Sequence, residues 1–276
     1  MVALLRAGKR PWNVYADLLE DEGSALPILQ DELGLLAAEQ IDEAVRQIAQ
    51  WEARSIQLTT ILDPEYPQNL RAVYDRPPMI FVAGNLAPED GRAVAVIGSR
   101  RPSKSGIAQA RQIGAHLAAH GYTVASGLAT GIDTAAHTGA LEREGRTIAV
   151  IGTGLDHCYP PQNAALQRRI AKEGAVVSQF WPETRPSRRT FPMRNAVMSG
   201  ISLATVVVEA SATSGARLQT RLARGQGRAV LLLGSLVQRQ PWARELARRP
   251  GTHVVNSPDE LTAVVGRLTS PGALVA

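Results

Sequence analysis

The sequence contains one cysteine, Cys158, and aromatic residues make up only 4% of its 276 residues. A single cysteine excludes an internal disulfide framework and is typical of a cytoplasmic protein. The scarcity of aromatic residues argues against a broad platform on which nucleic-acid bases stack. No apolar run approaches the ~18 residues that a membrane-spanning helix needs, and the N-terminus lacks the profile of a signal peptide. We therefore expect a cytoplasmic protein with no membrane association.

Several motifs of nucleotide and hydrolytic chemistry are also missing. The first predicted strand is not followed by Gly-x-Gly-x-x-Gly, and the chain has no Walker A signature. Gly-x-Ser-x-Gly and the His/Cys spacings of zinc sites are absent as well. These absences disfavour a dinucleotide-dependent dehydrogenase, a P-loop NTPase and an α/β-hydrolase, and we expect neither a cofactor nor a metal.

Charge is distributed unevenly along the chain. Residues 1–90 hold 7 Lys and Arg against 15 Asp and Glu, whereas residues 91–276 hold 23 against 10. The net charges of the two parts are therefore −8 and +13. A basic part of this kind suggests a polyanionic partner. The alternative is that genome composition alone favours arginine, which supplies almost all of the cations.

The first 91 residues divide into two predicted regions. Residues 1–56 are predicted to form a small acidic helical region, with a first helix that begins near Pro11 and ends at Gly23. Residues 57–91 are predicted to form an extended lead-in. The segment "IQLTTILDPEYPQNL" is predicted to be a strand that leads into a proline-rich turn, and "RPPMIFVAGNL" a second short strand that ends at Gly84-Asn85, before the linker "APEDGR".

The remainder, residues 92–276, alternates between apolar runs and helix-patterned segments. The predicted strands are residues 93–98, 122–126, 147–152, 175–178, 204–209, 228–233 and 252–255. Most of these runs are continuously apolar, which is typical of strands covered on both faces. The alternation predicts an α/β domain with a doubly wound, Rossmann-like parallel sheet.

Candidate ligand-binding residues follow the predicted strands. In an open parallel sheet, ligands bind at the carboxyl ends of the strands, where glycine bares the backbone, helix N-termini offer N–H groups and arginine grips phosphate. The candidates are Gly98, Ser99, Arg100, Ser126, Gly127, Leu128, Gly131, Gly152, Gly154, Arg194, Asn195, Ser214 and Gly215. Together they predict a site for a sugar-phosphate chain.

Groups that could carry a reaction are few. Asp133 and His137 are spaced for an Asp–His pair on one helix face, but an aspartate at a helix start is more often a cap. Cys158 follows His157, and adjacency in sequence says little about a nucleophile–base pair. Glu209 is the one carboxylate that ends a predicted strand. We therefore expect no catalytic residues.

Five segments together are similar to the motif series of one family. They are "VIGSRRPSKSG", "SGLATGIDTAAHTGAL", "GTGLDHCYPPQNAAL", "FPMRN" and "VVVEASATSGARLQT". In this order they resemble the DNA-processing protein A (DprA/Smf) family, over about residues 57–230. The resemblance implies a non-catalytic homodimer that binds single-stranded DNA in natural transformation and recombination and helps to load a RecA-type recombinase. Its DNA pocket would correspond to Gly98–Arg100, Ser126–Leu128, Arg194–Asn195 and Ser214–Gly215.

The chain departs from the family pattern at several positions. Ala196 stands where the family commonly has arginine, Gln179 where it has glutamate, and Leu233-Gly234 replaces Val-Pro-Gly. We expect no C-terminal winged helix, so the chain would be a divergent member.

Two other functions remain open from the sequence. One is a nucleotide-binding sensor of a defence system, which shares every phosphate-binding feature. The other is a nucleotide phosphoribohydrolase-like enzyme, which would need a carboxylate at the ribose carbon, a role for which Glu209 is the candidate. The Pro-Gly-Gly-x-Gly-Thr motif of such enzymes is absent.

Overall fold

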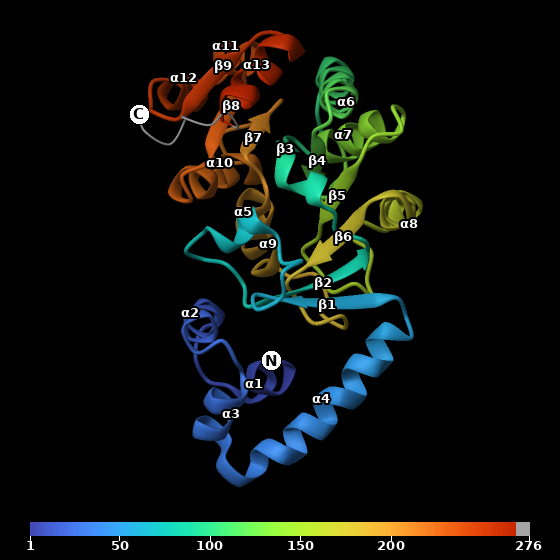
Figure 1. The fold of residues 1–276 in the computed structure, drawn as a ribbon. Helices are drawn as coiled ribbons and strands as arrows, with labels where there is room; N and C mark the ends of the chain where they lie inside the picture. The colour runs from blue at the N-terminus through green and yellow to red at the C-terminus, as the bar shows by residue number, and fades with distance from the viewer. Residues whose placement is uncertain (269–276) are drawn as a thin grey trace.

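A nine-stranded mixed sheet forms the centre of the computed structural model, which describes residues 1–268 (Figure 1). The strands are β1 (Ile56–Thr60), β2 (Met79–Gly84), β3 (Ala93–Ile97), β4 (Thr123–Ser126), β5 (Thr147–Val150), β6 (Ala175–Ser178), β7 (Ala204–Val207), β8 (Ala229–Leu233) and β9 (Thr252–Val255). Their order in the sheet is β1-β2-β6-β5-β4-β3-β7-β8-β9. All seven strands predicted after residue 92 are confirmed.

The α-helices lie between the strands and at the N-terminus. They are α1 (Val2–Ala7), α2 (Trp12–Glu22), α3 (Leu26–Leu33), α4 (Ala37–Glu52), α5 (Gln68–Arg71), α6 (Lys104–Ala119), α7 (Ile132–Leu141), α8 (Ala164–Glu173), α9 (Thr190–Ile201), α10 (Gly215–Gly225), α11 (Gly234–Arg239), α12 (Pro241–Ala247) and α13 (Pro258–Leu268). Within residues 1–268, none of the helices is both long and apolar enough to cross a membrane.

Strands β3 to β9 are parallel, as the continuous apolar runs predicted. Every residue of β3 and of β8 is buried, because helices cover both faces of this part of the sheet. The sheet is not parallel throughout: β2 pairs antiparallel with β6, and β1 antiparallel with β2. The lead-in strands therefore extend the edge of the sheet.

The order of the strands reverses between β3 and β7. From β3 the chain adds β4, β5 and β6 on one side, and it then returns to place β7, β8 and β9 on the other side of β3. The loops after β3 and β7 consequently diverge, which opens a crevice at their carboxyl ends. This is the position at which open α/β sheets bind ligands.

The N-terminal helices form a lobe below β1 in Figure 1, and the long α4 leads into that strand. Gly23 ends α2 in the left-handed conformation (φ 65°), as expected for a C-terminal glycine. Trp51 near the end of α4 packs edge-to-face on Phe81 of β2, with ring centroids 5.0 Å apart. The lobe and the sheet thus share one hydrophobic core.

The stretch expected as a linker folds as the 3₁₀-helix η2 (Pro88–Arg92). Its Asp90 is buried and accepts hydrogen bonds from the Nε and Nη2 atoms of Arg146, at 2.6 and 2.7 Å. The division of the chain into domains at residues 56 and 91 stays a prediction, and residues 269–276 of the predicted C-terminal domain lie outside the described residues.

Candidate nucleic-acid interface

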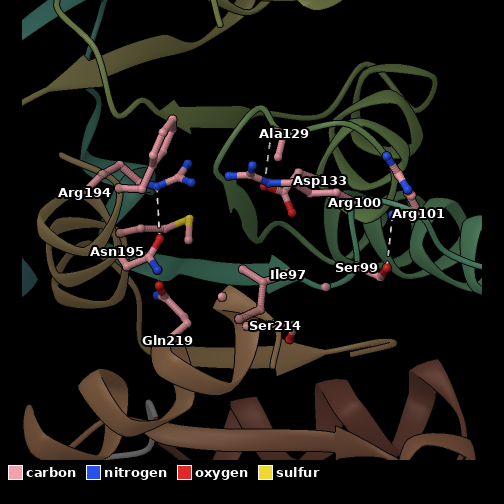
Figure 2. A pocket seen from close by; sticks show the side chains of 15 residues that line it. Ile97, Ser99, Arg100, Arg101, Ala129, Asp133, Arg194, Asn195, Ser214 and Gln219 are labelled. Atoms are coloured by element: carbon pink, nitrogen blue, oxygen red, sulfur yellow. Dashed lines mark hydrogen bonds between the residues drawn. The ribbon is translucent and has the colours of Figure 1, made fainter. Parts of the chain in front are cut away.

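A pocket of about 510 Å³ opens at the crevice between β3 and β7 (Figure 2). Four segments line it: the end of β3 and its loop, the start of α7, one side of α9, and the start of α10. The lining residues are Ile97, Gly98, Ser99, Arg100, Arg101, Ala129, Asp133, Phe191, Arg194, Asn195, Met198, Ser214, Gly215, Ala216 and Gln219. We call this cavity the switch pocket.

The loop after β3 is fixed on both sides by backbone hydrogen bonds. The Ser99 N–H donates to the carbonyl of Glu209 at 2.6 Å, and its carbonyl accepts from the Ile132 N–H at 3.2 Å. A Cβ at Gly98 would lie 2.6 Å from the Ile132 side chain, so only glycine fits there. These contacts hold the two following arginines at the mouth of the pocket.

Arg100 and Arg101 supply exposed positive charge. Within residues 1–268, neither forms a salt bridge with a carboxylate. The guanidinium of Arg100 lies 5.3 Å from the ring centroid of Phe191, and this cation–π contact favours one orientation of the Arg100 side chain. An exposed guanidinium group beside an aromatic ring, with a second exposed arginine next to it in the chain, is suited to a phosphate with an attached base.

The start of α10 supplies backbone donors and unpartnered polar groups. A Cβ at Gly215 would meet nothing within 4 Å, so the first turn of this helix is open to a ligand. Within residues 1–268, the Ser214 hydroxyl and both amide atoms of Gln219 are buried without a hydrogen-bond partner. Buried polar groups left unpaired cost about 1–3 kcal/mol each, and a ligand that reached them after a small side-chain rotation would remove that cost.

Arg194 is buried beneath the pocket, which differs from the expected exposed phosphate contact. Its side chain is 5% exposed, and its Nη1 donates to the carbonyls of Gly127 at 2.5 Å and Val150 at 2.8 Å. Its Nε donates to Asn195 Oδ1 at 3.1 Å (Figure 2). The guanidinium therefore ties the carboxyl ends of β4 and β5 to α9.

Asp133 lies close to this buried arginine. Its Oδ2 accepts from the Ala129 N–H at 3.3 Å, which fixes the turn before α7. Burial raises the pKa of Asp133, and the positive charge of Arg194 opposes that shift. Burial also lowers the pKa of Arg194. The two groups provide charge compensation under the pocket floor.

Six of the predicted residues do not line the switch pocket. Ser126 donates to the carbonyl of Val96 at 2.6 Å, and Leu128 is fully buried in a small hydrophobic cluster. The other four are glycines, each in close contact with the protein itself. A Cβ would lie 1.9 Å from Arg194 at Gly127, 2.4 Å from the Ser99 carbonyl at Gly131, 2.7 Å from Phe191 at Gly152 and 2.1 Å from the Trp181 carbonyl at Gly154. These glycines allow chain segments to approach one another and do not present amides to the cavity.

The groups considered for catalysis are engaged elsewhere. His137 is fully buried, its Nδ1 lies 2.7 Å from the Thr147 hydroxyl, and burial lowers its pKa to about 3. It makes no pair with Asp133. Burial raises the pKa of the Cys158 thiol, whose Sγ lies 3.4 Å from the Pro160 carbonyl. The contacts of His137 and Cys158 are thus with neighbouring parts of the fold, and neither residue lines the switch pocket.

Glu209 contributes to a helix cap and does not line the switch pocket. Its two carboxylate oxygens accept from the Ser103 N–H at 3.0 Å and the Ser103 hydroxyl at 2.6 Å. The same hydroxyl caps α6 by accepting from the Gly106 N–H at 3.0 Å. The carboxylate that the phosphoribohydrolase interpretation requires is thus hydrogen-bonded to Ser103 and does not line the switch pocket.

Seven predicted residues do meet in the pocket: Gly98, Ser99, Arg100, Arg194, Asn195, Ser214 and Gly215. The other lining residues were not among the predicted site residues, and Arg101, Phe191 and Gln219 are three of them. Helical spacing offered a signal for two, since Phe191 is three residues before Arg194 and Gln219 four residues after Gly215.

Comparison with known proteins identifies the family of this chain. The family model of DNA recombination-mediator protein A matches residues 57–265. The chain belongs to this family. The match begins at the lead-in strands and covers all nine strands except the first residue of β1.

Among the relatives, Protein Smf of Synechocystis is 34% identical over 269 residues, covering 92% of this chain and 67% of that protein. DNA processing protein DprA of Streptococcus pneumoniae is 41% identical over 179 residues, covering 64% and 63%. The chain thus spans about two thirds of the length of these relatives.

Solved structures of the family share the fold. The X-ray structure of DprA from S. pneumoniae superposes with a TM-score of 0.77 and 31% identity, covering 95% of both chains. DprA from Helicobacter pylori, solved to study its single-stranded DNA binding mode, gives a TM-score of 0.67 over 76% of this chain and 96% of that one. Its identity of 23% supports the fold alone.

Proposed function

We propose that the protein binds single-stranded DNA in recombination of the kind that accompanies natural transformation, and that it catalyses no reaction. The observation that carries the proposal is the switch pocket, where two unpaired arginines and the open start of α10 face one cavity at the point of strand reversal. Membership of the family of DNA recombination-mediator protein A supports the same ligand.

The dimensions of the pocket favour a single strand. Its volume of about 510 Å³ is that of a small-ligand cavity, with room for one or two nucleotides. A phosphate beside Arg100 leaves its base near Phe191, whereas a duplex would keep its bases stacked inside and contact only the rim. We therefore expect preference for unpaired DNA and little dependence on sequence.

The test is fluorescence anisotropy with a labelled oligothymidine at low salt. Arg100→Ala should weaken binding to all sequences by a similar factor, because the lost contact is to phosphate. Arg143→Ala removes another exposed arginine, beyond the end of α7, and should leave the affinity unchanged. Absence of binding by the unaltered protein to any oligonucleotide would refute the proposal.

A mononucleotide sensor is the second candidate, because the unpartnered amide of Gln219 lies in a cavity large enough for a nucleotide. Thermal-shift measurements separate the two. Stabilisation by DNA but not by mononucleotides favours the first function, and the reverse favours the sensor.

We further propose that the protein acts in the cytoplasm as a homodimer and delivers DNA to a RecA-type recombinase. Support for the compartment is the free thiol of Cys158. Support for self-association is the position of β9 at one end of the sheet, with Val254 41% exposed. Analytical ultracentrifugation tests the dimer, and strand exchange on DNA coated with single-strand-binding protein tests the delivery.

A further inference from the structure

A second cavity, of about 500 Å³, lies where the N-terminal lobe meets the sheet. Its walls come from the start of α2, the segment before β2, the residues after β6, and the side of α9 that faces away from the switch pocket. Trp12 and Trp181 are among its lining residues, and we call it the tryptophan pocket.

The walls of this pocket are aromatic and apolar. The rings of Trp12 and Trp181 meet at 84° with centroids 5.8 Å apart, so they form two adjoining walls. Met193, on α9, is 49% exposed at the edge of the same cavity. A flat ring that enters such a corner stacks on one indole and meets the edge of the other.

The charged residues that line the tryptophan pocket are already paired, which favours an uncharged ligand. Arg76 is the one cation among its lining residues, and its Nη2 is bound by the carboxylates of Asp17 and Glu20. Asp75 also lines the cavity and accepts from Gln226 Nε2 at 2.6 Å. Among the described residues that line the pocket, no cation is therefore left unpaired for a phosphate.

One hydrogen-bond donor in the wall lacks a partner. Gln179 is 6% exposed, and its Nε2 is buried without an acceptor among the residues that the structure describes. Rotation of the amide toward the cavity would allow a ligand to provide that acceptor, and every nucleobase carries acceptors on its edge.

The two pockets lie on opposite sides of one helix at the same edge of the sheet. Phe191 and Arg194 of α9 line the switch pocket, whereas Met193 and Ala196 line the tryptophan pocket. Gln179 follows β6 as Ser99 follows β3, and these strands run parallel. The sites are thus separated by roughly one helix diameter, about 10 Å.

From these observations we propose that the tryptophan pocket receives one base of the single strand whose phosphate occupies the switch pocket. The base stacks on Trp12 and accepts a hydrogen bond from Gln179. The strand crosses the start of α9, next to the exposed Arg188 and Arg189. This inference rests on the proposed function and adds a second subsite to it.

The experiment uses a series of labelled oligothymidines, each with one abasic deoxyribose at a different position, and measures the affinity of the full chain for each. One position should show a loss of roughly tenfold, the scale of one base–aromatic stack. Trp12→Leu and Gln179→Leu should each weaken binding of the intact oligonucleotide, and the abasic change at that position should then have little further effect. Trp12→Leu should also lose the part of the tryptophan fluorescence quenching that the intact strand causes.

The controls separate the two proposals. Tyr74→Leu alters an exposed aromatic residue that does not line the cavity and should bind like the unaltered protein. If Trp12→Leu fails to fold, Gln179→Leu decides, because its Nε2 loses no hydrogen bond on substitution. Unchanged abasic profiles in both variants, with Arg100→Ala still defective, would overturn the second subsite and leave the proposed function intact.

Two other results would also overturn the inference. If the unaltered protein binds no oligonucleotide, the proposed function and this inference fail together. If Trp12→Leu changes the oligomeric state in ultracentrifugation and leaves DNA affinity unchanged, the occupant is another protein surface.

Discussion

Replacement of Arg194 by methionine tests whether this residue holds the switch pocket together or contacts DNA directly. Methionine keeps an unbranched side chain of similar length but removes the charge and the donors. The carbonyls of Gly127 and Val150 would each lose their bond to Nη1, and Asp133 would lose the positive charge that opposes its raised pKa. The substitution therefore removes the link between α9 and the ends of two strands.

The magnitude follows from the burial of these groups. Each buried acceptor left unpaired costs about 1–3 kcal/mol, and part of this is offset because burial of the Arg194 charge is itself unfavourable, as its lowered pKa indicates. We expect a net loss of about 2–4 kcal/mol in the free energy of unfolding. For a chain of this size, that corresponds to a fall in Tm of roughly 5–15 °C.

Urea denaturation and thermal melting measure the loss, with Arg189→Met as the matched control. Arg189 is exposed immediately before α9, and its replacement should change stability by less than ~0.5 kcal/mol. A variant at position 194 that retains full stability but binds DNA poorly would refute the structural role and restore the direct phosphate contact that the sequence predicted.

Three further predictions concern binding, acid stability and glycine packing. Arg100→Ala should reduce the dependence of log affinity on log salt by about 0.7 for single strands while leaving the urea midpoint unchanged; an unaltered salt slope would remove Arg100 from the interface. His137 has a folded-state pKa lowered to about 3, below the unfolded value near 6.5, so its contribution to stability is complete above pH 6.5 and is lost as the pH falls toward 3. That loss amounts to about 1.4 kcal/mol per pH unit, and His137→Gln should flatten it in urea titrations at a series of pH values; equal slopes in the two proteins would contradict the assignment. Gly154→Ala should destabilise the protein by about 2 kcal/mol or more, because its Cβ would lie 2.1 Å from the Trp181 carbonyl, whereas Gly215→Ala has open space and should leave the Tm unchanged or slightly raised; equal melting temperatures would show that the backbone yields at position 154.

The secondary structure from residue 92 onward was largely predictable because strands covered on both faces must be apolar at every position. The β3 sequence "AVAVI" and the β8 sequence "AVLLL" show this directly. The antiparallel pairing of β1 with β2 and of β2 with β6 was not predictable, because the sequence of a short strand does not indicate which strand lies next to it. Helix α1 was likewise missed, since its six residues are too few to show a helical period.

Some of the site residues were likewise predictable from the sequence and others were not. Gly98, Arg100 and Gly215 were predicted as ligand-binding residues because they follow predicted strands, and the structure places all three in one pocket at the sheet reversal. Gly127 and Gly154 carried the same local signal and yet pack against protein atoms. A glycine after a strand indicates that another group lies close to the backbone there. Only the folded structure shows whether that group is a ligand or another segment of the protein.

The sequence by itself determined the parallel α/β architecture, the basic character of the larger region and the family to which the chain belongs. These properties depend on local apolar runs, composition and motif order, all of which are linear features. The tertiary structure alone decided that Arg194 is a buried tie, that Glu209 belongs to a helix cap, and that Trp12 and Trp181 share a cavity. These roles depend on contacts between residues far apart in the chain, since burial and partnership arise only when the strands and helices pack.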